Sequence, residues 1–194
     1  MKKAIDALLK FVAEGDQEKS DKALFLKYAK NTDTILTRDS ELFHFTASAF
    51  VVNEDKTKVV SAHHNIFGSW CWLGGHTDGD EDFLHVAKKE VEEESGIKNV
   101  KLYGDGIFSL ETLPVLGHTK RGKHVPAHTH LNVTYVFIAS EKENLQICEG
   151  ENRDIAWLDI QDIIVTSEEK YMRPIYKKII NKIHRLEKEA DNQK

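Results

Sequence analysis

A run of glutamates in the middle of the chain has the spacing of a divalent-cation site. Glu90, Glu93 and Glu94 stand three and four residues apart, so a helix would place their carboxylates on one face within a single turn. Like charges at this spacing weaken a helix by roughly 0.2–0.5 kcal/mol per pair, and the helix dipole disfavours them near the C-terminal end. Oxygen ligands at this density suit Mg²⁺ or Mn²⁺. Carboxylates that destabilise their own helix therefore predict a cation site.

The same run has a simpler interpretation, as a solvated helix face made of good helix formers. Its surroundings favour the cation site, because a Gly-Gly pair and a further glutamate precede it and a Gly-Ile pair follows it. This arrangement resembles the Nudix box, whose pattern is Gly, five residues, Glu, seven residues, then Arg-Glu-apolar-x-Glu-Glu-x-Gly-apolar. Lys89 stands where the pattern has Arg. The positions that match are Gly75, Glu81, Glu90, Val91, Glu93, Glu94, Gly96 and Ile97.

The resemblance extends beyond the box, over roughly residues 43–164. Family members commonly carry Trp-x-x-Pro-Gly-Gly before the box, and residues 70–75 fit this pattern with a leucine in place of the proline. Many also carry acidic residues six and three positions before a late tryptophan, as Glu151 and Asp154 precede Trp157. The first two predicted helices lie outside the resemblance.

The resemblance implies an enzyme that uses a divalent ion to direct water onto a phosphorus of a diphosphate. The implied substrate is a nucleoside diphosphate derivative, of the nucleotide sugar, dinucleotide or nucleoside triphosphate class. By analogy, Lys89 orients a neighbouring carboxylate, and Glu151 is the candidate for a further metal ligand or general base, with Glu149 and Asp154 as competitors. The implied ligands of Mg²⁺ or Mn²⁺ are Glu90, Glu93, Glu94 and the backbone carbonyl of Gly75.

Strands with helices inserted between them are expected around this motif. An apolar stripe with helical spacing predicts a helix at the N-terminus, and a second helix covers residues 21–30. Strands are predicted at 43–52, 58–63, 70–73, 100–113, 130–139 and 155–158, and helices at 81–95, around 163–164 and at 167–188. The fold class is α/β: a Nudix-type α/β/α sandwich around a mixed β-sheet, with additional N-terminal helices. Residues 1–40 are interpreted as a helical extension and 41–194 as the Nudix hydrolase domain, including the C-terminal helix.

Several histidines gather late in the chain, at His118, His124, His128 and His130. On a strand, His128 and His130 point to the same side, where they could bind zinc or a substrate phosphate. A zinc site needs further ligands, which the sequence does not place. Lys120 and Arg121 add positive charge in the same loop, and the competing interpretation is a solvated loop with histidines at a strand end. The predicted substrate-binding residues are His76, Lys120, Arg121, His128 and His130.

Composition limits the classes of protein to consider. The chain has 194 residues, a formal net charge of −5, 40% hydrophobic and 30% charged residues, which describes one ordinary globular domain. The acidic balance argues against nucleic-acid and anionic-membrane partners, and a small-molecule substrate is expected instead. No apolar run approaches the roughly 18 residues of a membrane span. Two cysteines without a CxxC spacing favour a cytoplasmic protein, and the oligomeric state, a homodimer included, stays open.

Two other functions share the expected fold. One is an isopentenyl-diphosphate-isomerase-like enzyme, which would make Cys71 indispensable. The competing interpretation of Cys71 is a buried, inert thiol between two tryptophans. The other is a non-catalytic Nudix-fold nucleotide sensor, against which the complete set of box glutamates argues.

Overall fold

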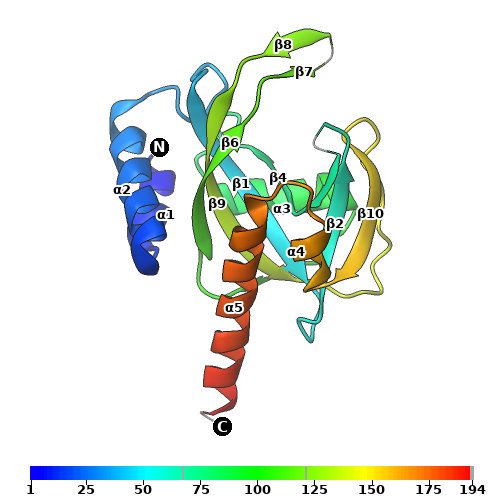
Figure 1. Cartoon of the computed structure of the whole chain (residues 1–194). Helices are drawn as coiled ribbons and strands as arrows, with labels where there is room; N and C mark the ends of the chain where they lie inside the picture. Colours follow the sequence, from blue (N-terminus) through cyan, green and yellow to red (C-terminus); the bar gives the residue numbers. More distant parts are fainter. Residues whose placement is uncertain (67, 121, 193–194) are drawn as a thin grey trace.

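The computed structural model describes residues 1–66, 68–120 and 122–192. Its centre is an eight-stranded sheet with helices on both faces (Figure 1). The sheet strands are β1 (Phe43–Val52), β2 (Lys58–His64), β3 (Ser69–Cys71), β4 (Leu73–His76), β5 (Lys101–Tyr103), β6 (Ser109–Val115), β9 (His128–Ile138) and β10 (Asn152–Asp159). A separate hairpin is formed by β7 (His118–Lys120) and β8 (Lys123–Val125). The helices are α1 (Lys2–Lys10), α2 (Gly15–Asn31), α3 (Phe83–Ser95), α4 (Asp162–Thr166) and α5 (Met172–Asp191).

The sheet is mixed, and its long axis is the pair β1 and β9. These two strands run parallel over their whole length, while β2 and β4 pair with β1, and β5 and β6 with β9, in antiparallel fashion. The strand order β10-β2-β1-β9-β5 places β1 at the centre, with β9 paired along it and the last residue of β4, His76, paired with Thr46 near its start. Residues from three distant parts of the chain therefore meet at that end of the sheet.

Alternation along β1 builds two cores on opposite faces of the sheet. Phe45 and Ala47 belong to the core that also contains the buried residues of α1, α2 and α3. Phe50 and Val52 belong to the second core, with the buried face of α5 and Trp72. Because successive side chains of a strand point to opposite faces, one ten-residue strand supplies both cores. The predicted α/β/α sandwich around a mixed sheet with N-terminal helices is confirmed.

A buried polar link ties the N-terminal helices to α5 across the edge strand β6. Glu18 of α2 and Glu111 of β6 are both buried, and the Lys178 ammonium of α5 lies 3.1 Å and 3.0 Å from their carboxylates. The Ser109 hydroxyl lies within hydrogen-bond distance of both carboxylates and can donate its one proton to either. One ammonium compensating two buried carboxylates fixes α2 against the sheet. The division into residues 1–40 and 41–194 stays a prediction.

Several predicted element boundaries are corrected by the structure. The strand expected at 70–73 is two short strands, β3 and β4, because the chain passes from pairing with β2 to pairing with β1 at Trp72. The strand expected at 100–113 is likewise divided into β5 and β6, and α2 begins earlier than predicted. The hairpin β7–β8 lies in a segment interpreted as a loop. None of the helices in the described parts of the chain is long and apolar enough to cross a membrane.

Candidate functional site

The glutamate-bearing helix α3 begins and ends at residues suited to those positions. The Asp82 carboxylate accepts a hydrogen bond from the backbone N–H of His85 at 3.2 Å, so the helix starts after Asp82. Glu81, expected in the first turn, therefore precedes the helix, where it pairs with the N-terminal ammonium. At the other end Gly96 takes φ of 74°, the left-handed conformation that closes a helix. The helix thus runs from Phe83 to Ser95, and the three box glutamates lie in its C-terminal half.

Two of the predicted ligands lie against the Gly-Gly pair of β4. The backbone N–H of Gly74 donates a hydrogen bond of 2.9 Å to Oε2 of Glu94, whose side chain is buried. The Glu90 carboxylate lies where a side chain at Gly75 would be, since a Cβ built there would be 2.7 Å from Oε2 of Glu90. The absence of a side chain at Gly75 thus makes room for a carboxylate beside the backbone of β4.

Burial and mutual repulsion disfavour the charged forms of Glu90 and Glu94. Burial, helped by the charges of Glu90 and Glu151 and opposed by the hydrogen bond from Gly74, raises the pKa of Glu94 to about 8. Burial also raises the pKa of Glu90 to about 7, with Lys89 opposing and Glu93 and Glu151 adding to the increase. A cation bound between them would lower these pKa values and favour the charged forms near neutral pH. The donor set, all carboxylate and carbonyl oxygen, fits a hard divalent ion.

Glu151 reaches this group from a different part of the chain, the segment before β10. It immediately precedes β10, is half-buried, and its charge acts on both Glu90 and Glu94. Its competitors Glu149 and Asp154 are exposed, and Asp154 accepts a hydrogen bond from the backbone of its own neighbour. The structure thus brings together the three box glutamates and Glu151, and it favours Glu151 over the other two acids.

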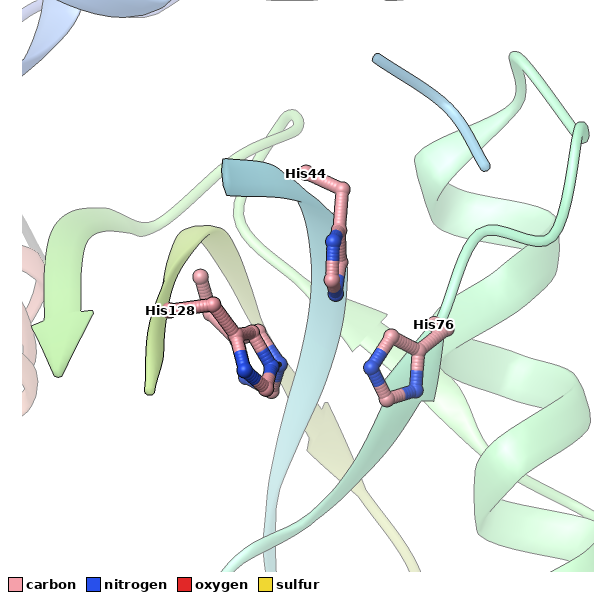
Figure 2. A group of neighbouring side chains, drawn as sticks. His44, His76 and His128 are labelled. Carbon is pink, nitrogen blue, oxygen red and sulfur yellow. Dashed lines mark hydrogen bonds between the residues drawn. The ribbon is translucent and has the colours of Figure 1, made fainter. Parts of the chain in front are cut away.

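The predicted substrate-binding residues divide into two groups. His76, His128 and His130 come together with His44, which the sequence analysis did not select. Figure 2 labels His44, His76 and His128 of this group. The nitrogens that could bind an ion all lie within 4.8 Å of one another. His118 and His124, on the hairpin β7–β8, are outside this group, so the predicted cluster of late histidines is corrected. Arg121 and the side chain of Lys120 lie outside the described residues.

Two of the clustered imidazoles, those of His130 and His44, resist protonation. Burial lowers the pKa of His130 to about 2, with the neighbouring His76, His44 and His128 contributing. Burial also lowers the pKa of His44, against a hydrogen bond with the Ser40 carbonyl that raises it. Near neutral pH both rings are therefore uncharged.

Comparison with known proteins identifies the family of the chain. The NUDIX domain model matches residues 42–183, which is most of the chain. The chain belongs to the Nudix family. An RNA pyrophosphohydrolase of Pelagibacter ubique is 30% identical, over 58% of this chain and 74% of that protein. The prediction of a Nudix hydrolase, in the pyrophosphohydrolase class, is confirmed, and enzymes of this family generally use divalent metals.

Solved Nudix structures share the fold of this chain at low identity. An Ap4A hydrolase of C. elegans, in a binary complex, superposes with a TM-score of 0.54 at 17% identity, over 72% of this chain and 97% of that one. A NUDIX-family hydrolase of Clostridium perfringens gives 0.52 at 20% identity, over 72% and 97%. These neighbours establish the architecture and leave the substrate open.

Within the Nudix box, Lys89 contacts Glu93. The Lys89 ammonium donates to the Glu93 carboxylate at 3.0 Å, one helical turn along, and both side chains are about half exposed. We expect Lys89→Ala to lower kcat several-fold, because Glu93 loses the contact that orients it, and Lys89→Arg to match or exceed the natural protein, since a guanidinium holds a carboxylate with two donors. Steady-state rates at saturating Mg²⁺ test this, with the exposed neighbour Lys88→Ala as the control. Unchanged turnover in Lys89→Ala would show that the position is a bystander.

One residue beside the box was missed by the sequence analysis. Asn152, at the start of β10, is buried, and neither atom of its amide group has a hydrogen-bond partner. The amide lies close enough to the Glu94 carboxylate to lower its pKa, although the two do not form a hydrogen bond of ordinary geometry. A buried amide without partners beside buried carboxylates indicates a place for a further polar group, such as a water or an ion.

Proposed function

We propose that this Nudix protein hydrolyses the diphosphate bond of a nucleoside diphosphate derivative, with Mg²⁺ or Mn²⁺ held by Glu90, Glu93 and Glu94. The observation that carries the proposal is the pair of buried carboxylates against Gly74 and Gly75, with Glu93 and Glu151 close enough to act on them. Burying several charged carboxylates together is unfavourable, and a bound cation would offset that cost.

Each residue has a distinct task in this proposal. Glu94 is fixed by its hydrogen bond to the Gly74 backbone, and Glu90 is positioned in the space at Gly75, where the neighbouring carbonyl can join the ligand set. Lys89 orients Glu93. Glu151 accepts the proton from the attacking water, because it is half-buried and approaches from another element. The bound divalent ion would neutralise diphosphate charge and favour ionisation of a water.

The proposed substrate is a class of nucleotides rather than one compound. An acidic chain argues for a small nucleotide rather than a long nucleic acid. The Pelagibacter ubique relative is named for RNA, and a C. elegans neighbour for Ap4A, so both belong among the candidates. We propose that the substrate offers a diphosphate joined to a nucleoside.

A substrate screen tests the proposal directly. The full chain is incubated with nucleotide sugars, dinucleotides, nucleoside triphosphates, Ap4A and triphosphorylated RNA, each with Mg²⁺, with Mn²⁺ and with EDTA, and the products are separated. We expect metal-dependent cleavage within at least one class. Binding of a nucleotide without product would favour the sensor, and isomerisation without release of phosphate or nucleotide would favour the isomerase.

The isomerase alternative requires a reactive Cys71, which the structure does not favour. Cys71 is buried, its thiol faces the Ala62 carbonyl at 3.5 Å, and burial raises its pKa far above the ordinary value. We expect Cys71→Ser to keep hydrolysis within a few-fold while lowering the melting temperature, since a hydroxyl replaces a buried thiol. Rates and thermal melts measured together, with the less buried Cys148→Ser as control, check this. Complete loss of turnover at an unchanged melting temperature would support the isomerase.

A further inference from the structure

The four clustered histidines come from the same end of three adjacent strands. His44 begins β1, His76 ends β4, and His128 and His130 begin β9. The register places His44 opposite His130 and Thr46 opposite His76, so the histidines share one face of the sheet. Figure 2 shows the labelled rings of His44, His76 and His128 turned toward one another. Four imidazoles gathered from three separate segments are a donor set, since each offers a ring nitrogen within 4.8 Å of the others.

Hydrogen bonds to backbone carbonyls prepare two of the rings to bind a metal. Nδ1 of His44 lies 2.9 Å from the Ser40 carbonyl, and Nδ1 of His128 lies 2.9 Å from the Pro126 carbonyl. A carbonyl only accepts, so each Nδ1 carries the proton and each Nε2 keeps its lone pair. This is the arrangement by which metal-binding histidines are oriented in proteins.

The lone pairs lie where an ion would need them. Nε2 of His44 has no hydrogen-bond partner, and it is buried, since only 4% of the surface of His44 is exposed to solvent. Nε2 of His128 lies 3.2 Å from Nε2 of His130, which can donate a hydrogen bond to it, and a bound ion would take the place of that shared proton. Two nitrogens bound tetrahedrally at about 2.0–2.1 Å from zinc would be about 3.3–3.4 Å apart. The 3.2 Å separation of this pair is close to that spacing, and the nitrogens of the other two rings, now within 4.8 Å, would move closer when an ion binds.

We propose that His44, His76, His128 and His130 bind one divalent transition-metal ion of the zinc class. An all-imidazole set suits Zn²⁺ and its neighbours, whereas Mg²⁺ requires oxygen ligands. The nearby Asp78 carboxylate forms a two-pronged ion pair with Arg38, at 2.9 Å and 3.0 Å, so that pair adds no net charge beside the ion.

The histidine site is separate from the carboxylate site. Gly75 faces α3, because its missing side chain is replaced by Glu90, whereas the next residue, His76, faces the opposite side of the sheet. An ion here would join the ends of β4, β1 and β9. It would thereby hold the segment between His76 and α3, which leads to the glutamates.

Metal content provides the test, independent of hydrolysis. The full chain without an affinity tag is stripped with EDTA, loaded with Zn²⁺ alone, desalted and analysed for metal. We expect one Zn²⁺ per chain and a higher melting temperature than the stripped protein. The double variant His128→Gln/His130→Gln should bind Zn²⁺ at least about 100-fold more weakly. The controls are His118→Gln/His124→Gln, which lies on the hairpin, and Glu94→Gln, which lies at the carboxylate site, and both should retain Zn²⁺.

Two outcomes would overturn the proposal. One is sub-stoichiometric Zn²⁺ in the wild-type chain. The other is equal retention by the cluster variant and the hairpin control. Should the cluster variants fail to fold, Co²⁺ in the wild-type chain decides: intense visible absorption of a four-coordinate nitrogen site supports the proposal, and the weak absorption of six-coordinate Co²⁺ contradicts it. Binding of inorganic phosphate in place of Zn²⁺ would also contradict it.

Discussion

Glu94→Gln is expected to lower Mg²⁺-dependent hydrolysis by at least about 100-fold, because it removes a charged ligand while keeping the shape of the side chain. Glutamine retains an oxygen to accept the hydrogen bond from the Gly74 backbone, so β4 and α3 should stay in place. Initial rates across a Mg²⁺ titration measure the effect. Glu92→Gln, an exposed glutamate on the same helix, is the matched control and should keep wild-type turnover.

The same substitution should stabilise the metal-free protein at alkaline pH. The pKa of Glu94 is about 8 in the folded chain against an ordinary 4.5, so the folded state binds this proton more tightly than the unfolded state does. The associated stability is present below pH 4.5 and is lost as pH rises toward 8. Thermal melts in EDTA at pH 8.5 should therefore place Glu94→Gln above the wild type by at least about 2–4 °C, the shift produced by about 1 kcal/mol in a chain of this size. Hydrolysis that survives both chelation and this substitution would contradict the assignment of Glu94.

The parts of this site that follow from local spacing could be predicted from the sequence. Glu90 and Glu94 share a helix face by helical period alone, and the Gly-Gly pair before the helix marked the segment, strand β4, against which they lie. The other positions of the box were predicted from the family resemblance. Fold class followed from the alternation of strands and helices, since that pattern depends on short stretches of sequence.

The histidine site could not be predicted in the same way. His128 and His130 are two residues apart on one strand, which the sequence shows, but His44 joins them only through the parallel pairing of β1 with β9. His76 joins through β4, a strand whose separation from β3 at Trp72 has no signal in the hydrophobic pattern. Tertiary pairing between distant segments, rather than any local period, creates this cluster.

Gly75→Ala is expected to weaken metal binding while leaving the stability of the fold nearly unchanged. Gly75 has a backbone conformation that other residues adopt. The three atoms nearest to a Cβ built there all belong to the Glu90 carboxylate. The carboxylate is the far end of a flexible side chain, so it can move aside at little cost to folding. Because the backbone carbonyl of residue 75 is unchanged, the substitution tests the position of Glu90 alone. We expect the Mg²⁺ concentration for half-maximal rate to rise at least about tenfold, the effect of a misplaced metal ligand.

The measurement is a Mg²⁺ titration of the rate beside a thermal melt of each variant. Gly106→Ala is the matched control, since a Cβ there meets nothing within 4 Å and its backbone is also compatible with alanine. Gly74→Ala gives the opposite contrast: its φ of 156° and the 2.8 Å approach of a Cβ to the Ala47 carbonyl oxygen should destabilise β4 itself. A wild-type Mg²⁺ requirement in folded Gly75→Ala would mean that Glu90 need not lie against β4 to bind the ion.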